Sequence, residues 1–265
     1  MKPARTVLIC HHDEPLNRFG LARWLASFTE LAAIVVIHEP QGRLVKRVRR
    51  EMRRVGVFRF LDVLAFRLYY KLMLAARDRT WSEAKLAELE RSYADVPASC
   101  RVVSVASPNG ADILRELRHL QPDLILARCK TILRPEIFET ASRGTFVMHP
   151  GICPEYRNAH GCFWALANRD LSRVGMTLLR IDAGVDTGPV YGYFGCGYDE
   201  RTESHIVIQN RVVFDNLDAL RDRFEEILRG EARTFDTSGR ESRAWGQPWL
   251  TAYARWKLRA GKGNG

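Results

Sequence analysis

The chain has 265 residues, of which 46% are hydrophobic; this is enough to bury a sizeable core and excludes a disordered polypeptide. Its net charge of +10 indicates an anionic partner, such as a nucleotide-linked sugar, RNA or an acidic membrane surface, unless the basic surface is simply solvated. Six scattered cysteines without Cys-x-x-Cys spacing are typical of a reduced, cytoplasmic protein without a structural zinc site.

The first 40 residues predict a strand, a helix and a second strand. Residues 6–10 and 31–37 are short runs rich in Val and Ile, as in buried parallel strands, with a helix expected over 16–28. The loop 11–18 lacks a Gly-rich phosphate cradle, so it is not a dinucleotide fingerprint. We expect no metal there, because its adjacent histidines point in different directions. Residues 1–5 lack the apolar core of a signal peptide.

Residues 40–95 interrupt this alternation and are expected to form an inserted basic helical hairpin. Segment 42–55 carries seven Lys and Arg residues, and 58–76 mixes aromatic and basic residues. We expect the hairpin to pack on the sheet with its charges facing water. The alternatives are a phosphate-binding arm, through which nucleic acid could bind, and an interfacial membrane helix. Four charged residues interrupt the apolar stretch 57–76, which argues against a membrane span.

The alternation resumes after the insertion. Strands are expected at 101–105 and 123–127, with a helix over 111–120 between them, and two further β-like runs occur at 144–148 and 175–180. This order predicts an α/β fold with a doubly wound, mainly parallel sheet. Such sheets bind ligands beyond the carboxyl ends of their strands. Four polar residues follow predicted strand ends: His11, Asn109, Lys130 and His149.

The last part of the chain predicts one long helix, 204–228, and then an irregular tail. We expect residues 1–200 to form the catalytic domain and 201–265 to pack on it. The aromatic residues of the tail are expected to pack against that domain and not to stack on bases: Trp245, Trp249, Tyr253 and Trp256.

His149 and Asp186 are the most informative pair in the sequence. His149 begins the run His-Pro-Gly-Ile-Cys-Pro-Glu-Tyr-Arg, and Asp186 lies within Asp-Ala-Gly-Val-Asp-Thr-Gly-Pro, each shortly after a predicted strand. Either loop alone would be read as ordinary polar residues. Together they suit acid–base chemistry at the edge of a sheet.

These two motifs resemble the formyltransferase family that uses 10-formyltetrahydrofolate, which includes glycinamide ribonucleotide, methionyl-tRNA and sugar N-formyltransferases. The family pattern is roughly Asn-x-His-Pro, then Pro-x-Tyr/Trp-Arg-Gly, a helix, Gly-x-Thr and Asp-x-Gly-x-Asp-x-Gly. The strongest match covers about residues 121–197. The matching residues are His149, Pro150, Pro154, Tyr156, Arg157, Gly175, Thr177, Asp182, Gly184, Asp186 and Gly188.

The sequence departs from the family at the catalytic Asn, where it has Val147. Valine cannot donate a hydrogen bond, and losing one such donor typically costs on the order of 100- to 1000-fold in rate. Either another group replaces the Asn, or the chemistry has changed, or activity has been lost. The candidate replacements are Lys130, Asn158 and His160. Lys130 comes first, although it could equally be a rim lysine that attracts an anionic substrate.

The resemblance implies a role for each site residue. In formyl transfer an amine attacks a formyl carbon, and His149 would stabilise the resulting oxyanion or move a proton. Asp186 would orient the imidazole or relay the amine proton, while Asp182 would tie down its own turn. Arg157, Asn158 and His160 would bind the acceptor. Arg157 would bind a phosphate or carboxylate of that molecule. The alternative for Arg157 is a surface ion pair. The candidate folate contacts are Cys129, Thr131, Ile132, Leu133, Asp182, Ala183, Gly184 and Val185, although Ile132 and Leu133 could be plain core residues.

The resemblance therefore predicts formyl transfer from 10-formyltetrahydrofolate to a primary amine. A nucleotide-linked amino sugar, or another small anionic amine, is the acceptor we expect, since the chain lacks a long second domain like that of the tRNA-directed members. One alternative is a degenerate or repurposed relative that binds folate or nucleotide. Another is an RNA-directed formyltransferase that uses the basic segment 43–54. The sequence leaves a homodimer open.

Overall fold

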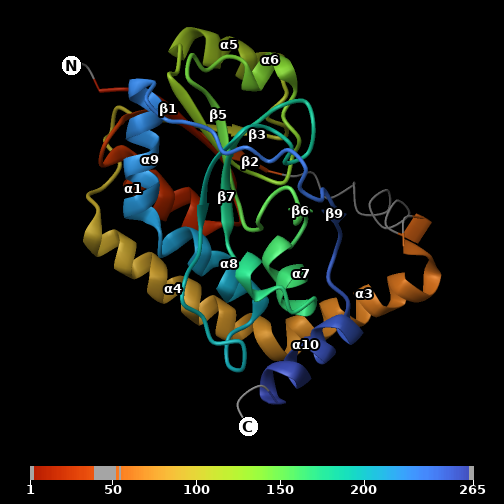
Figure 1. Ribbon diagram of the computed structural model, residues 1–265. Helices are drawn as coiled ribbons and strands as arrows, with labels where there is room; N and C mark the ends of the chain where they lie inside the picture. Colours follow the sequence, from red (N-terminus) through yellow and green to blue (C-terminus); the bar gives the residue numbers. More distant parts are fainter. Residues whose placement is uncertain (1–2, 39–51, 54, 263–265) are drawn as a thin grey trace.

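The computed structural model describes residues 3–38, 52–53 and 55–262. A seven-stranded sheet of order β3-β2-β1-β4-β5-β7-β8 lies at its centre (Figure 1). The five strands from β3 to β5 are parallel, whereas β7 and β8 each run antiparallel to the preceding strand in this order. This confirms the predicted α/β fold with a mainly parallel sheet. The strands are β1 (Arg5–His11), β2 (Glu30–Ile37), β3 (Arg101–Val105), β4 (Leu124–Arg128), β5 (Gly144–His149), β7 (Met176–Arg180) and β8 (Val190–Phe194).

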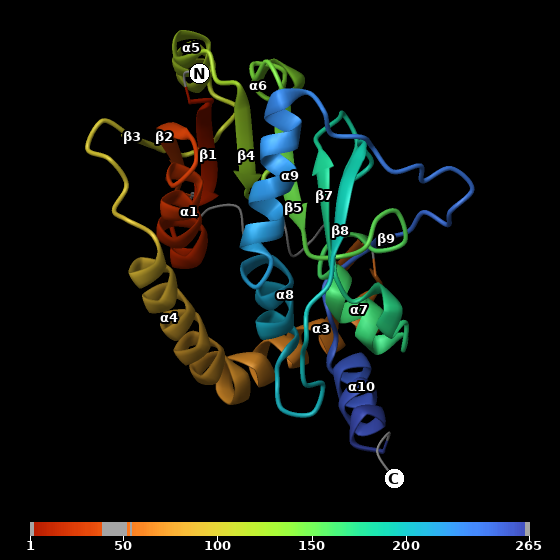
Figure 2. The ribbon, with the colours of Figure 1, turned by 60° about the vertical axis from the view of Figure 1, so that its left-hand side comes forward.

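Helices cover both faces of the sheet (Figure 2). In β1, Leu8 and Cys10 belong to one hydrophobic cluster and Val7 and Ile9 to another, as expected from the two-residue period of a strand. The first cluster includes residues of α1, α7, α8, α9 and α10; the second includes residues of α5 and α6. The sheet is therefore doubly wound. The helices are α1 (Ala22–Ala26), α3 (Val57–Tyr69), α4 (Ala75–Ser92), α5 (Ala111–Leu120), α6 (Pro135–Phe138), α7 (Gly161–Ala167), α8 (His205–Phe214), α9 (Leu217–Arg229) and α10 (Leu250–Lys262).

The single helix predicted over 204–228 is wrong, because the structure has two helices, α8 and α9, there. The break falls at Asn216, whose backbone is not helical. Its side-chain amide donates to the carbonyls of Val212 (3.0 Å) and Gly195 (2.9 Å). An Asn side chain that bonds nearby backbone groups competes with the helix, which explains the break.

The tail is also more regular than predicted. Residues 250–262 form α10, and a two-residue strand β9 (Ala244–Trp245) pairs with β6 (Arg157–Asn158). Trp256 is fully buried, and the Trp245 ring stacks on Tyr156 with centroids 5.7 Å apart. The predicted packing of the tail aromatics against the domain is therefore confirmed for these two residues.

The second half of the predicted basic hairpin is helical. Helix α3, a π-helical turn η3 (Tyr70–Leu74) and α4 follow one another without a loop. The first half, 43–54, lies outside the described residues except for Met52 and Arg53. The predicted phosphate-binding or interfacial role of that segment stays a prediction.

Candidate functional site

His149 and Asp186 meet beyond the carboxyl end of the sheet. His149 is the last residue of β5, and its side chain is buried. Its Nδ1 atom lies 3.5 Å from Oδ2 of Asp186, and its Nε2 atom lies 2.8 Å from the carbonyl oxygen of Tyr156. A carbonyl oxygen can only accept, so Nε2 carries a proton and donates it. Nδ1 is thus the ring nitrogen that faces the carboxylate.

The loop of Asp186 is tied to the segment that follows His149. The backbone N–H of Asn158 donates to Oδ2 of Asp186 at 2.8 Å, and Nη1 of Arg157 donates to the carbonyl of Val185 at 2.8 Å. Asp186 itself has φ +52°, a left-handed conformation that Asp tolerates better than most residues. Arg157 and Asn158 therefore brace the site in this structure, and their predicted contacts with substrate stay predictions.

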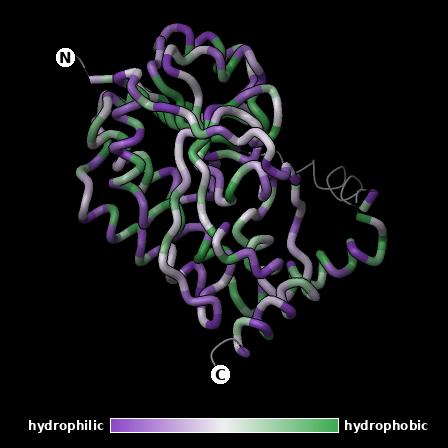
Figure 3. Tube along the Cα trace, viewed as in Figure 1, coloured by the Kyte–Doolittle hydropathy of each residue, from purple (hydrophilic) through white to green (hydrophobic). Residues whose placement is uncertain are grey.

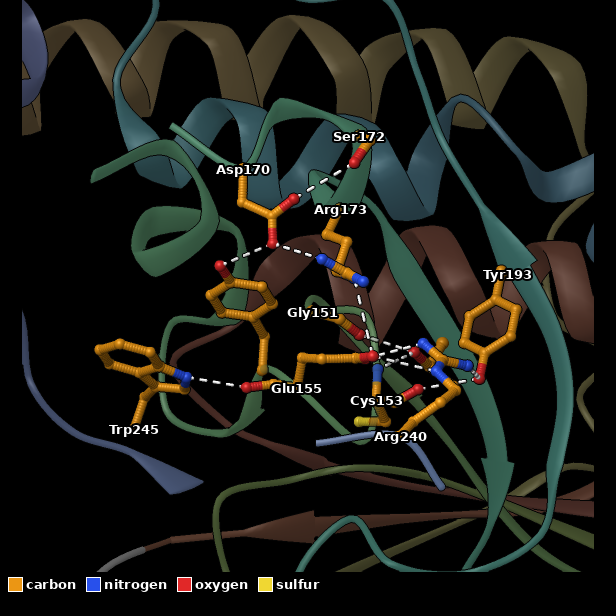
Figure 4. A network of polar contacts seen from close by, with 11 residues as sticks. Gly151, Cys153, Glu155, Asp170, Ser172, Arg173, Tyr193, Arg240 and Trp245 are labelled. Carbon is orange, nitrogen blue, oxygen red and sulfur yellow. Dashed lines mark hydrogen bonds and ion pairs between the residues drawn. The ribbon is translucent and has the colours of Figure 1, made fainter. Parts of the chain in front are cut away.

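A network of hydrogen bonds fixes the turn after His149 (Figure 4). The hydroxyl of Thr177, on β7, donates to the carbonyl of Gly151 at 2.7 Å and accepts from the N–H of Cys153 at 2.9 Å. The Tyr193 hydroxyl donates to the carbonyl of Cys153 at 2.8 Å. Thr177 also lies opposite His149 in the pairing of β5 with β7. One hydroxyl thus sets the path of the chain directly beyond the histidine.

The C-terminal segment supports the same turn from the other side. Arg240 donates through Nε and Nη2 to both carboxylate oxygens of Glu155, at 2.9 and 2.7 Å. The indole N–H of Trp245 donates to the Glu155 carbonyl at 2.9 Å. Such a bidentate pair fixes geometry as well as charge. Residues past 230, for which no role at the site was predicted, therefore help to position it.

Val147 occupies the position of the family Asn, two residues before His149 and on the same face of β5. It is half-buried, and its partners in the sheet are Ala127 and Leu179. These strand neighbours are aliphatic, so they offer no side-chain donor in place of the Asn. A replacement donor has to come from beyond the strand ends.

Lys130, the predicted replacement, points its ammonium at Glu14. Its Nζ atom lies 2.7 Å from Glu14 Oε1, and its backbone N–H donates to Nε2 of His11 at 3.0 Å. Burial raises the pKa of the Glu14 carboxyl, but Lys130 and the nearby Arg128 outweigh this and leave the pKa below its ordinary value. Glu14 is therefore ionised at neutral pH. The role of Lys130 as a donor to substrate stays a prediction.

Glu14 belongs to a polar chain that ends behind His149. Its Oε2 accepts from the Asn17 amide at 2.7 Å, and Asn17 Oδ1 accepts from Nε of Arg128 at 3.2 Å. Nη1 of Arg128 donates to the carbonyl of Met148. Glu14, Asn17 and Arg128 were not predicted as site residues. The sequence signal for them was Arg128, because a charged residue at the end of an otherwise apolar strand needs polar partners.

The first predicted folate loop, 129–133, is partly exposed. Ile132 has 67% of its surface exposed, whereas Leu133 is buried in the cluster with α5 and α6. The side chain of Asn109 braces this loop, donating to the carbonyl of Ile132 at 2.9 Å and accepting from the N–H of Arg134 at 2.8 Å. The Cys129 thiol donates to the carbonyl of Thr131 at 3.4 Å; burial raises its pKa to about 11, so it is neutral at physiological pH.

The second predicted folate loop is organised by Asp182, as expected. Its carboxylate accepts from the N–H of Gly184 at 2.9 Å and from the hydroxyl of Thr187 at 2.8 Å. This closes the turn and leaves the tip, Ala183 to Val185, exposed beside Asp186. The exposed backbone and the Val185 side chain are the part of this loop that a ligand can reach.

His160 precedes α7 as its N-cap residue, with φ +56°, and its ring centroid lies 5.6 Å from that of His205 on α8. Burial lowers the pKa of His160 to about 4, so its imidazole is neutral at physiological pH. It could hydrogen-bond a substrate but would not add charge. Across residues 3–38, 52–53 and 55–262, no group of three or more His, Cys, Asp or Glu residues is placed to hold a metal ion.

A family model described as formyl transferase matches residues 82–222, which is more than half of the chain. The methionyl-tRNA formyltransferase of Thermodesulfovibrio yellowstonii is 35% identical over 80 residues. That match covers 30% of this chain and 26% of the relative, so the chain spans about a quarter of the length of the curated relative it matches.

Two solved structures share the fold over nearly the whole chain. A sugar N-formyltransferase from a Shewanella species superposes with a TM-score of 0.53 at 13% identity, covering 97% of this chain and 87% of the other. Phosphoribosylglycinamide formyltransferase from Anaplasma phagocytophilum superposes with a TM-score of 0.55 at 13% identity, covering 91% and 98%. At this level of identity the likeness establishes the fold.

Proposed function

Since this chain belongs to the formyl transferase family, we propose that it transfers a formyl group from 10-formyltetrahydrofolate, the donor the family uses, to a primary amine. The observation that carries the proposal is the placement of His149 between the carbonyl of Tyr156 and the carboxylate of Asp186. The reaction needs a donor for an oxygen that becomes negative and an acceptor for the amine proton. These two side chains supply one of each.

His149 serves as the donor. Its Nε2–H is held by Tyr156, so the ring cannot turn, and both ring nitrogens face acceptors. To donate to an oxyanion, the ring uses a proton on Nδ1 in addition to the one on Nε2. The 3.5 Å separation between Nδ1 and Asp186 is longer than a good hydrogen bond, which leaves the Nδ1–H free to donate to the formyl oxygen.

Asp186 serves as the acceptor. One carboxylate oxygen, Oδ2, is held by the N–H of Asn158, so the group stays fixed while its other lone pairs remain available. It can take the proton of the attacking amine and pass it to the folate nitrogen, whose bond to the formyl carbon breaks as the tetrahedral intermediate collapses. The left-handed backbone conformation of Asp186 sets the orientation of this carboxylate.

We propose that the formyl donor, 10-formyltetrahydrofolate, binds at the two exposed loops. Ile132 and Val185 present apolar side chains, and the Asp182 turn presents free backbone near Asp186. A flat heterocycle with polar edges is recognised by this combination of apolar contact and backbone hydrogen bonds. We therefore assign 129–133 and 182–185 to donor binding.

For the acceptor we propose an anionic amine, with a nucleotide-linked amino sugar as the first candidate. The net charge of +10 favours phosphate-bearing molecules. The structural neighbour from Shewanella is a sugar N-formyltransferase. We also place the reaction in the cytoplasm, since all six cysteines are free thiols.

The test is calorimetric titration with a non-hydrolysable 10-formyltetrahydrofolate analogue, followed by formyl-transfer assays on a panel of amines. We expect saturable binding by the wild type and weaker binding or altered enthalpy in Asp186→Asn. Asn fits the left-handed backbone and keeps the shape, so this variant changes the charge alone. His149→Gln should bind the analogue but lose about 100- to 10,000-fold in kcat.

His119→Gln is the matched control for His149, since His119 lies exposed on α5 near Arg5 and Glu30, at the amino-terminal ends of β1 and β2. Binding without transfer to any amine in the panel would favour the alternative of a degenerate relative that retains the ligand. An absence of binding at millimolar analogue would overturn the proposal.

A further inference from the structure

Helix α3 and the turn η3 expose an unusual run of apolar side chains. Half of the large hydrophobic residues that are exposed in the described part of the chain fall between positions 57 and 73. Phe58 is 90% exposed and Leu72 70%. Isolated exposed hydrophobic residues are normal, but a contiguous patch marks an interaction surface. The patch, called here the α3 outer face, consists of Val57, Phe58, Leu61, Leu64, Leu68, Leu72 and Met73.

The opposite side of the same helix is already packed against the protein. Phe60, Val63 and Phe66 are buried, and the Phe66 ring lies 5.2 Å from that of Tyr253 on α10. Asp62 accepts from the backbone N–H of Thr251 at 3.0 Å. The α3 outer face therefore cannot turn inward. A surface helix usually has one apolar side, and this helix has two.

Figure 1 shows α3 running out from the body of the protein, and Figure 3 shows hydrophobic and hydrophilic residues alternating along it. Arg67 on α3 and Lys71 in η3 are exposed; Arg59 is also exposed, but its guanidinium stacks over the Trp249 ring at 4.0 Å. In the sequence, residues 43–77 include eleven Lys and Arg residues but only two acidic ones. Nearly all of the chain's net charge of +10 therefore comes from this stretch.

We propose that the α3 outer face docks on the surface of an anionic lipid bilayer. An apolar helix face within a strongly basic stretch is the combination that binds at the interface of such membranes, with the side chains entering the acyl region and the cations meeting lipid phosphates. Within the described residues, none of the helices is both long and apolar enough to cross a bilayer, so α3 lies along the surface.

A second copy of the chain is the alternative partner for the α3 outer face. Phe58, Leu61, Leu68 and Leu72 follow the alternating spacing of a coiled-coil seam. Self-association through this face would, however, bring the exposed Arg67 and Lys71 of two copies towards each other, and like charges at an interface oppose association. An anionic membrane neutralises the same charge. The charge pattern therefore favours lipid.

The test is co-sedimentation of the full chain with vesicles of phosphatidylcholine alone and of equal parts phosphatidylcholine and phosphatidylglycerol. We expect binding to the anionic vesicles that weakens as salt rises, with little binding to the neutral ones. Leu61→Glu and Leu68→Glu should each weaken partitioning about tenfold or more, because each removes a leucine that the bilayer would bury. Lys71→Gln should weaken it about fivefold.

Leu258→Glu is the matched control, because Leu258 is also a highly exposed helical leucine, 66% exposed on α10. It should bind vesicles as the wild type does. Equal binding to neutral and anionic vesicles, or an equal loss in Leu258→Glu, would overturn the proposal. A wild type that sediments as a dimer without lipid and becomes monomeric in Leu68→Glu would also overturn it in favour of a second copy. None of these measurements uses folate or amine, so the proposed function is tested separately.

Discussion

Gly161 lies so close to Gly151 that a Cβ atom on Gly161 would fall 2.5 Å from the Cα of Gly151. Gly161 is the first residue of α7, and Gly151 is in the turn after His149. Their contact lets the helix approach the turn and holds the Tyr156 carbonyl against the histidine ring. Glycine is needed at both positions because backbone meets backbone there.

Gly151→Ala should therefore damage the site more than the fold. The added Cβ would lie 2.7 Å from Nε2 of His149 and 2.5 Å from the Tyr156 carbonyl oxygen, so both the ring and the neighbouring backbone must move. We expect a loss of about 100-fold or more in kcat from the displaced imidazole, with about 1–3 kcal/mol of destabilisation from overpacking. Formyl-transfer kinetics and thermal unfolding of the same variant measure the two effects.

Gly197→Ala is the control for that change. Gly197 is exposed, has no positive φ, and its Cβ would meet nothing within 4 Å. It should change stability by less than about 0.5 kcal/mol and leave kcat unaltered. Wild-type activity in Gly151→Ala would show that the His149–Tyr156 contact is dispensable.

Thr177 offers a test of the turn without added bulk. Thr177→Val should remove both hydrogen bonds of the hydroxyl, leaving the buried carbonyl of Gly151 and the N–H of Cys153 unpaired. We expect about 2 kcal/mol or more of lost stability and a lower kcat as the turn loosens. Thr177→Ser keeps the hydroxyl and should stay close to wild type in both measurements. Equal effects of Val and Ser would mean that the methyl group, and not the hydroxyl, is what matters.

The sheet and the site pair were predictable because their signals are local. The strands β1 and β2 are short apolar runs. His149 and Asp186 come shortly after such runs, close to Gly and Pro. The break at Asn216 was not, because it depends on carbonyls that the folded chain brings to its side chain. The partner of His149 Nε2 is a backbone carbonyl, which the identity of residue 156 does not reveal.

The polar chain from Glu14 to Arg128 was missed for a related reason. Asn17 and Arg128 are 111 positions apart, and they become neighbours because β1, which precedes the helical turn of Asn17, pairs in parallel with β4. The support from Arg240 and Trp245 is equally non-local. Pattern reasoning found residues that carry chemistry, whereas residues that position them depend on tertiary contacts.

Val147→Asn tests whether the hydrogen-bond donor that the family has at this position can be restored. Val147 is half-buried on the face of β5 that carries His149, with aliphatic neighbours on both adjacent strands. An amide there can donate to the same formyl oxygen as His149, so we expect kcat to rise, by up to about 100-fold. Val147→Leu, which adds volume without a donor, is the control. A fall in kcat with Asn would show that the site works through other contacts, among which Lys130 is the first to examine.

His205 should make the fold sensitive to acid. It is 1% exposed and surrounded by Phe66, Phe163 and Tyr253, and burial lowers its pKa well below the ordinary value of 6.5. Below pH 6.5, His205 binds a proton in the unfolded chain but stays neutral in the native state. The neutral His205 therefore makes its full contribution to the free energy of unfolding above pH 6.5. As the pH falls below this value, the free energy of unfolding decreases by about 1.4 kcal/mol per pH unit.

His205→Phe, which keeps a ring but cannot titrate, should flatten the fall in unfolding free energy between pH 6.5 and 5, measured by urea denaturation. His119→Gln, at an exposed position, should leave the wild-type profile unchanged; an unaltered profile in His205→Phe would mean that other groups cause the acid sensitivity.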